Sequence, residues 1–430
     1  MRIFYTLTLT LMLPLILARL LWRSLKQRGY RENIGERFGL YDQPALENCI
    51  WIHAVSVGET RATEPLVRRL KALDPARPIL LTSMTPTGRA TALALFGDAV
   101  TCVYLPYDLV VLHQPLFEHF RPSVLLLMET EIWPNLLHAC KKKAVPVLIV
   151  NARLSERSAL GYARFAPIRS LVGQALQSVH AVAAQSAADA ERFRMLGAQR
   201  IVVSGNIKFD VSLDPALLRL GEGWRKDSGG RRVLLCASTR DGEETLLLAA
   251  YVKIFDAEER QDTLLVIVPR HPQRFDRVAV DMQNAGLRCA RRSQTMTGVA
   301  ELRPEVLLGD SMGEMAAYYS LSDVVIIGGS LLPLGGQNLI EACALGKPVI
   351  MGPSTFNFGE AARLARDAGA MRQVPNALEA MREARRLLRD EFSRQTMSDA
   401  GLKLVAANRG ATEKTVSLIE SALAARRALA

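Results

Sequence analysis

The sequence contains few cysteines and no closely spaced pair of them. Six cysteines are scattered over 430 residues, and no C-x-x-C pattern occurs. This distribution argues against a zinc site and against a disulfide scaffold, and it favours a reducing, cytosolic setting for the folded part of the chain. The six histidines show no i, i+4 pairing, so we expect no metal ligands among them. Internal repeats and low-complexity tracts are also absent, which argues against a repeat architecture.

Acidic residues are too few to balance the basic ones. The formal net charge is +11, which suggests an anionic partner such as nucleic acid, anionic lipid or a phosphorylated substrate. The chain has no basic motif interleaved with aromatic residues, so we do not expect it to bind nucleic acid. With 49% hydrophobic and 23% charged residues, the composition is that of a globular protein, and the length allows two domains.

The amino-terminal segment is the one long apolar run. Residues 3–22, IFYTLTLTLMLPLILARLLW, contain Arg19 as their only charge, and as a helix they would measure about 30 Å, the thickness of a bilayer core. Between residues 19 and 37, six basic residues outnumber two acidic ones, so the positive-inside rule puts the following domain in the cytoplasm. We therefore predict a single membrane anchor over residues 1–22. A buried or interfacial helix is the alternative, because Pro14 and Arg19 weaken a membrane span.

The rest of the chain has the rhythm of repeated β–α–β units. Short apolar runs alternate with amphipathic stretches from residue 50 to 205, and the alternation restarts near residue 231. This rhythm predicts an α/β fold with two Rossmann-like domains that face each other across a cleft. We expect one domain over residues 35–210, a linker over 211–230 and a second domain over 231–425. In such sheets, ligands bind at the carboxyl ends of the strands.

Carboxylates stand at two of the predicted strand ends. In HAVSVGET, residues 53–60, Gly58 lets a bulky ligand approach closely, and Glu59 could take a proton from that ligand. Glu59 could equally cap the helix that follows. In METEIWPN, Glu129 and Glu131 are two residues apart, so on a strand both would point the same way. They could form an acid/base pair, or one of them could be structural.

A glycine-rich loop follows a predicted strand in GGSLLPLGGQNLIEA, which begins at residue 328. Gly335 and Gly336 could let backbone amides approach a phosphate at the start of the next helix. Asn338 and Glu341 are three residues apart on its first turn and would face the same ligand. Glu341 is suited to accept hydrogen bonds from ribose hydroxyls. An ordinary tight turn with a solvated glutamate is the alternative.

Three further stretches carry polar residues at strand ends. Arg270 and His271 in VPRHPQRF could grip a phosphate, and the prolines beside them stiffen the loop. Residues 312–314 in GDSMGEM have the pattern of a capped helix start. Lys208 in GNIKFD is an isolated cation near the predicted cleft. Each of these side chains could instead be solvated or structural.

Nine stretches, taken in order, resemble a known family. They are WIHAVSVGET, TSMTPTGR, METEIWPN, NARLSERS, GNIKFD, VPRHP, GDSMGEM, GGSLLPLGGQNLIEA and GPSTFNF. This order resembles that of 3-deoxy-D-manno-octulosonic acid (Kdo) transferases, the lipid IV(A) Kdo transferases of lipopolysaccharide biosynthesis, and it covers essentially the whole chain. The resemblance implies a glycosyltransferase-B fold, CMP-Kdo as donor and the lipid A precursor lipid IV(A) as acceptor. It also implies inversion without a metal or other cofactor, on the cytoplasmic side of the bacterial inner membrane.

The resemblance also implies roles for individual residues. Glu59 matches the general base of the family, and Glu129 and Lys208 match groups that stabilise the transition state. The CMP-contacting stretches match Pro269, Arg270, Met312, Gly313, Glu314, Asn338, Leu339, Ile340 and Glu341. The family pattern often has histidine where Gln337 and Arg240 stand here, which leaves the donor contacts near both positions open.

Two alternative functions fit the same architecture. One is a glycosyltransferase that uses a UDP-sugar, and the other is a non-catalytic, membrane-tethered protein that binds a nucleotide or a phospholipid. The carboxylates at the strand ends speak against the second alternative. The number of Kdo units transferred does not follow from the motifs.

Overall fold

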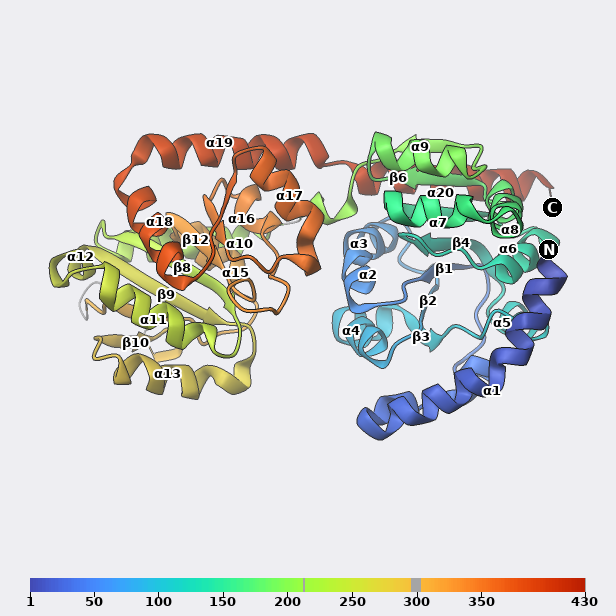
Figure 1. Cartoon of the computed structure of the whole chain (residues 1–430), viewed down its shortest axis with the longest axis horizontal. Coiled ribbons are helices and arrows are strands. Elements are labelled where there is room, and N and C mark those ends of the chain that lie inside the picture. Colours follow the sequence, from blue (N-terminus) through green and yellow to red (C-terminus); the bar gives the residue numbers. More distant parts are fainter. Residues whose placement is uncertain (212, 295–302, 430) are drawn as a thin grey trace. The chain divides into compact units, whose positions relative to one another are not determined.

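The computed structural model describes residues 1–211, 213–294 and 303–429. These residues form two compact units, which Figure 1 shows coloured along the chain. Unit 1 consists of Met1–Asp210 together with Asn408–Ala430, and unit 2 consists of Val211–Ala407. In the described part of the chain, each unit is an α/β domain built on a seven-stranded parallel sheet, so the predicted fold class is confirmed.

The sheet of unit 1 has the strand order β3-β2-β1-β4-β5-β6-β7. Its strands are β1 (Cys49–His53), β2 (Ile79–Ser83), β3 (Thr101–Tyr104), β4 (Pro122–Met128), β5 (Val147–Ala152), β6 (Ala181–Ala184) and β7 (Ile201–Val203). The helices are α1 (Arg2–Lys26), α2 (Val57–Ala62), α3 (Glu64–Leu73), α4 (Pro86–Phe96), α5 (Val110–Phe120), α6 (Pro134–Lys142), α7 (Glu156–Arg164), α8 (Ala166–Gln177), α9 (Ala187–Met195) and α20 (Ala411–Leu429).

Both faces of this sheet are covered, which explains why its central strands read as unbroken apolar runs. Alternate residues of each strand enter different cores. Trp51 and Leu125 pack in the core on one face, while Ile52 and Leu126 pack in the core on the other face. The second core also contains Ile419 of α20, a helix more than 200 residues away in the sequence.

The sheet of unit 2 has the order β10-β11-β9-β8-β12-β13-β14. Its strands are β8 (Arg232–Thr239), β9 (Thr263–Pro269), β10 (Cys289–Arg291), β11 (Val306–Leu308), β12 (Val324–Ile327), β13 (Val349–Met351) and β14 (Met371–Gln373). Its helices are α10 (Pro215–Asp227), α11 (Glu243–Ile254), α12 (Ala257–Asp262), α13 (Phe275–Asn284), α15 (Met315–Leu321), α16 (Ile340–Ala344), α17 (Gly359–Asp367), α18 (Ala377–Arg389) and α19 (Glu391–Asn408).

The unit boundaries differ from those expected from the sequence. The sequence predicts that residues 408–425 belong to the second domain, but α20 packs on unit 1. Asp210 of unit 1 accepts hydrogen bonds from the backbone amides of Gly410 and Thr412, at 2.6 Å each. Much of the stretch 211–230 is helix α10 rather than a loose linker. This helix packs on α15 so closely that a β-carbon at Gly221 would lie 2.3 Å from the Ala317 carbonyl oxygen.

The two edge strands of unit 2 do not follow from the sequence pattern. Strands β10 and β14 read CAR and MRQ, and neither contains an apolar run. Each joins the sheet through pairing with one neighbour, β11 or β13. Their strand conformation therefore depends on backbone pairing rather than on burial of alternating side chains.

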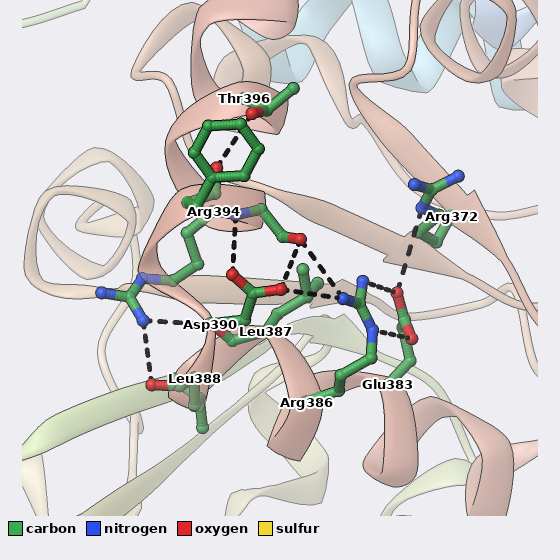
Figure 2. Close-up of polar contacts among 10 residues, drawn as sticks. Arg372, Glu383, Arg386, Leu387, Leu388, Asp390, Arg394 and Thr396 are labelled. Carbon is green, nitrogen blue, oxygen red and sulfur yellow. Dashed lines mark hydrogen bonds and ion pairs between the residues drawn. The ribbon is translucent and has the colours of Figure 1, made fainter.

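Helix α18 ends and α19 begins at Asp390, and Figure 2 shows the polar contacts around this turn. The Asp390 carboxylate accepts hydrogen bonds from the backbone amide and hydroxyl of Ser393, at 3.0 and 2.6 Å. Arg394 donates to the carbonyl oxygens of Leu387 and Leu388, near the end of α18. The two helices are thus connected by a capped turn, after which the chain returns to unit 1.

In each sheet the chain builds outward in both directions from a central pair of strands. This reversal lies between β1 and β4 in unit 1 and between β8 and β12 in unit 2, where β11 also lies between β9 and the edge strand β10. The loops that leave neighbouring strands at such a point diverge to opposite faces, so a crevice forms outside their carboxyl ends. HAVSVGET and METEIWPN follow β1 and β4, and the glycine-rich loop follows β12.

Candidate active site

Glu59 lies in the first turn of α2, where local hydrogen bonds position its carboxylate. One oxygen, Oε2, accepts a hydrogen bond from the Val55 amide at 2.8 Å, and Oε1 accepts one from the Ser56 hydroxyl at 2.8 Å. Ser56 is also the N-cap residue of this helix. Glu59 therefore does contribute to the helix start, as one of the two readings of the sequence predicted. Each carboxylate oxygen has a further lone pair with which to accept a proton or another donor.

Burial raises the pKa of Glu59 above its ordinary value. The charge of Glu129 raises this pKa further, whereas the hydrogen bonds from Val55 and Ser56 and the charge of Lys208 lower it. A carboxylate whose pKa is raised toward neutrality is a stronger base than an exposed one. The surroundings of Glu59 therefore suit its carboxylate to accept a proton better than exposure to water would.

Glu129 and Lys208 form an ion pair beside Glu59. Lys208 Nζ lies 3.2 Å from Glu129 Oε1, and both side chains are partly exposed. Glu129 has a φ of +56°, a left-handed conformation that is uncommon for a residue with a side chain. Lys208 lies on a single 3-10 turn, whose Ile207 amide donates to Asn151 Oδ1 at 3.0 Å. The structure therefore brings together the three residues predicted to be catalytic.

In unit 2, cationic side chains gather at the carboxyl ends of β8 and β9. Arg240 follows β8, and Arg270 and His271 follow β9, where Pro269 is the last strand residue. Partial burial lowers the pKa of His271, and the charges of Arg240, Arg270 and Arg274 lower it further. This concentration of positive charge is able to bind a phosphate.

Other predicted nucleotide contacts lie on two loops of the same unit. Met312 and Gly313 are exposed between β11 and α15, and Glu314 is the N-cap residue of α15. The Glu314 carboxylate accepts hydrogen bonds from Ser311 and, at 3.2 Å, from Arg292.

Asn338 and Glu341 are in direct contact, but the prediction that both lie on the first turn of the helix is wrong, because α16 begins at Ile340 and Asn338 precedes it. Asn338 Nδ2 donates to Glu341 Oε1 at 2.9 Å, and Asn338 Oδ1 accepts from the Ile340 amide at 2.9 Å. Leu339 and Ile340 are buried, so their side chains pack in the interior of unit 2. These contacts orient the Glu341 carboxylate.

The proposed role of the glycine-rich loop amides is wrong. The Gly335 amide donates to Ser354 Oγ at 2.9 Å, and the amides of Gly336 and Gln337 donate to the carbonyl oxygens of Gly329 and Gly328. These amides are therefore already used within the loop. Helix α16 also begins only at Ile340 and is five residues long, so the dipole available to an anion is small.

Comparison with known proteins identifies the family. A family model described as 3-deoxy-D-manno-octulosonic-acid transferase (kdotransferase) matches residues 32–211. The 3-deoxy-D-manno-octulosonic acid transferase of Bordetella pertussis is 43% identical over 430 residues, which cover 97% of this chain and 98% of the relative. The chain belongs to the Kdo transferase family. The enzyme of the same name from Haemophilus influenzae is 36% identical and also covers 97% of this chain and 98% of its own.

The membership confirms the resemblance seen in the sequence. A Kdo transferase is a glycosyltransferase, so the predicted enzyme class is confirmed, and the UDP-sugar and non-catalytic alternatives give way to it. A crystallised glycosyltransferase from Rickettsia africae has the same fold at 16% identity, with a TM-score of 0.52 over 89% of this chain and 99% of that one. The glycosyltransferase-B class expected from the sequence is thereby confirmed as well.

This Kdo transferase holds a third glutamate in the unit 1 site that the catalytic assignment left out. Burial raises the pKa of Glu131 to about 7, with the charges of Glu59 and Glu129 adding to the rise. The Trp133 indole N–H donates to Glu131 Oε2 at 2.8 Å. The METEIWPN motif contains this residue. The prediction that Glu129 and Glu131 share one face of a strand is wrong, because β4 ends at Met128.

Within the described residues of this Kdo transferase, no group of three or more His, Cys, Asp and Glu side chains could hold a metal ion. The carboxylates of unit 1 instead interact with one another and with Lys208. A reaction without a metal stays a prediction.

Proposed function

We propose that this Kdo transferase moves Kdo from CMP-Kdo to the lipid A precursor lipid IV(A), with inversion at the anomeric carbon. Unit 1 binds the acceptor and unit 2 binds CMP. One or more Kdo units are transferred. The observation that carries the proposal is the cluster of Glu59, Glu129 and Lys208 at the reversal of strand order in unit 1.

Glu59 serves as the general base. The acceptor hydroxyl oxygen forms a bond to the anomeric carbon of Kdo while the bond from that carbon to the CMP phosphate oxygen breaks. The hydroxyl proton moves to the Glu59 carboxylate, and CMP leaves with the bonding electrons. Attack on the face opposite the leaving group inverts the configuration. The raised pKa of Glu59 supports this role, because it brings the base closer to working pH.

Glu129 and Lys208 stabilise the transition state. The anomeric carbon becomes more positive as the bond to phosphate breaks, and the Glu129 carboxylate favours that charge. Lys208 offers a positive charge to the Kdo carboxylate or to the leaving phosphate. Their ion pair keeps both side chains in one place before the substrate binds, which lowers the reorganisation needed during the reaction.

Unit 2 binds the CMP moiety. Pro269 and Arg270, then Met312, Gly313 and Glu314, then Asn338, Leu339, Ile340 and Glu341 form the contact stretches. The phosphate is bound near the positive charge around Arg270, and Glu341 accepts hydrogen bonds from ribose hydroxyls. The contact between Asn338 and Glu341 supports this assignment, because it orients the carboxylate.

The site of action is the cytoplasmic side of the bacterial inner membrane, to which a single amino-terminal helix tethers the enzyme. Residues 2–25 form a helix of mean hydropathy 1.8 that is long enough to reach across a bilayer. The net charge of +11 suits an anionic lipid surface and a phosphorylated acceptor.

The substitution Glu59→Gln tests the proposal. The amide oxygen can still accept from Val55, and the amide nitrogen can donate to Ser56, but the side chain cannot take a proton. Turnover with CMP-Kdo and lipid IV(A) should fall by roughly 10²–10⁴-fold, while CMP affinity and melting temperature stay near those of the unmodified enzyme.

Glu64→Gln is the matched control, because Glu64 begins the neighbouring helix α3 and pairs with Arg68 on the protein surface. It should retain full turnover. A fully active Glu59→Gln enzyme would refute the general-base role, and mass spectrometry of the product from the unmodified enzyme counts the Kdo units added.

A further inference from the structure

Helix α1 lies lengthwise against unit 1. Its side chains that are buried or half-buried recur every three or four residues from one end to the other: Arg2, Tyr5, Thr6, Leu9, Leu13, Ile16, Leu17, Leu20 and Ser24. Residues at this spacing occupy one face of a helix. One face of α1 is therefore partly covered, with Leu20 and Ser24 buried on it, whereas a free membrane span would be exposed all round.

Polar contacts attach the first turns of α1 to buried groups of unit 1. The Tyr5 hydroxyl donates to Asp108 Oδ2 at 3.0 Å, and the Thr6 hydroxyl lies 3.1 Å from Asn135 Oδ1. Asp108 and Asn135 are almost fully buried. Asp108 also accepts from the backbone amides of Asn135 and Leu136, at 3.1 and 2.8 Å. This end of the helix is thus connected to the start of α6.

The last turns of α1 are attached to the same unit. Arg31 Nε donates to Ser24 Oγ at 2.9 Å, and Ser24 is buried. The Arg23 guanidinium lies over the Tyr30 ring, 5.3 Å from its centre. The chain therefore folds back at once after α1, so the last turns of the helix contact Tyr30 and Arg31 of the segment that follows it. About 33 Å of helix separates these contacts from those at its start.

The opposite face of α1 is apolar and exposed. It carries Ile3, Phe4, Leu7, Leu11, Leu15, Leu21, Trp22 and Leu25, and Leu11 is 82% exposed. Arg19 and Arg23 flank this face and are also exposed. An apolar strip of this length on a water-soluble surface marks an interaction site, and apolar residues with flanking arginines are typical of helices that lie in the surface of an anionic bilayer.

We propose that α1 is an interfacial helix, which lies in the plane of an anionic phospholipid surface with both ends on the side of unit 1. A crossing helix would carry Tyr5 and Thr6 to the far side of the bilayer. That movement would break the hydrogen bonds that Tyr5 and Thr6 make with Asp108 and Asn135. In the flat arrangement all of these contacts persist, and only the apolar face enters the lipid.

This arrangement also places unit 1 directly on the membrane surface. A lipid acceptor could then reach the protein without leaving the bilayer. The orientation of α1 relative to the bilayer does not depend on the chemistry proposed for Glu59.

Depth measurement on the full-length protein tests the proposal. Five of the six cysteines are buried and Cys289 is partly exposed, so single cysteines are introduced in a Cys289→Ser background at Phe4, Leu11 and Leu25, with Leu13 as the inward-facing control. Each variant carries a bimane label and is bound to phosphatidylethanolamine/phosphatidylglycerol vesicles. Quenching by lipids with spin labels at different depths then reports how deep each position lies.

The flat arrangement predicts that positions 4, 11 and 25 lie at one shallow depth and that position 13 is quenched least. A crossing helix predicts position 11 near the bilayer centre and positions 4 and 25 near opposite surfaces, and this result would overturn the proposal. Labels that no lipid quencher reaches, together with cross-linking of α1 between two molecules, would show that a second copy covers this face instead.

A covalent lock provides a second measurement. Thr6→Cys with Asn135→Cys, oxidised to a disulfide, holds the start of α1 on unit 1, because the side-chain oxygens of these residues are 3.1 Å apart. The locked protein should float with phosphatidylglycerol-containing vesicles as fully as its reduced form. Loss of flotation on oxidation would mean that α1 must leave unit 1 to bind lipid.

Discussion

Replacement of Glu131 by glutamine is expected to stabilise the protein at alkaline pH and to have no effect at acidic pH. Burial and the charges of Glu59 and Glu129 raise the pKa of Glu131 to about 7, from an ordinary value of 4.5. Below pH 4.5 the group is protonated in the folded and unfolded states alike. As pH rises from 4.5 to 7, only the folded state retains the proton, so the free energy of unfolding falls, and the loss is complete above pH 7.

The size of the effect follows from this difference. A rise of 2.5 pKa units corresponds to about 3.4 kcal/mol at 1.36 kcal/mol per unit. Water reaches part of the side chain and screens its charge, so we expect about 2 kcal/mol. Glutamine resembles the protonated acid and keeps an oxygen that can accept from the Trp133 indole. The melting temperature of a domain of this size rises by about 2–4 °C for each kcal/mol of added stability. Glu131→Gln should therefore raise the melting temperature by about 4–8 °C at pH 8.5.

Differential scanning calorimetry at pH 8.5 and pH 4.5 measures both effects on the same pair of proteins. Glu64→Gln is the matched control, because it removes the charge of a partly exposed glutamate that pairs with Arg68 on the protein surface. This control should show no gain at either pH. If Glu131→Gln shifted the melting temperature equally at the two pH values, or lowered it at pH 8.5, the raised pKa of Glu131 would be refuted.

Three further substitutions probe the donor site, the catalytic ion pair and the return of the chain to unit 1. Glu341→Ala should weaken CMP binding about tenfold or more, because a charged hydrogen bond contributes about 1.5–3 kcal/mol; unchanged affinity in calorimetry would remove Glu341 from the nucleotide site. Lys208→Met should lower turnover by about 10²-fold or more, and a fully active variant would contradict the proposed role. Asp210→Ala removes two charged hydrogen bonds from the start of α20, so urea titration should show a loss of about 2–4 kcal/mol; an unaltered midpoint would mean that apolar packing alone holds α20.

Local sequence pattern was enough to find most of the fold. Each unbroken apolar run that was predicted to be a strand forms one, because strands buried on both faces need apolar residues at every position. The motif residues also follow the strands as expected, since a parallel sheet brings the carboxyl ends of its strands to one edge. Glu59, Glu129 and Lys208 are separated by up to 149 positions in the chain, yet they meet at this edge.

Contacts between distant segments decided the rest. Nothing in the sequence of α20 says which sheet this helix covers, and its residues Val416, Leu418 and Ile419 pack in a core of unit 1. The raised pKa of Glu131 depends on its burial and on the charge of Glu59, which comes from helix α2. The amides of Gly335 and Gly336 look free in the sequence, but tertiary folding gives them other partners. Periodicity is a local property that the chain carries in its residues, whereas burial, partner choice and electrostatic field arise only when separate segments come together.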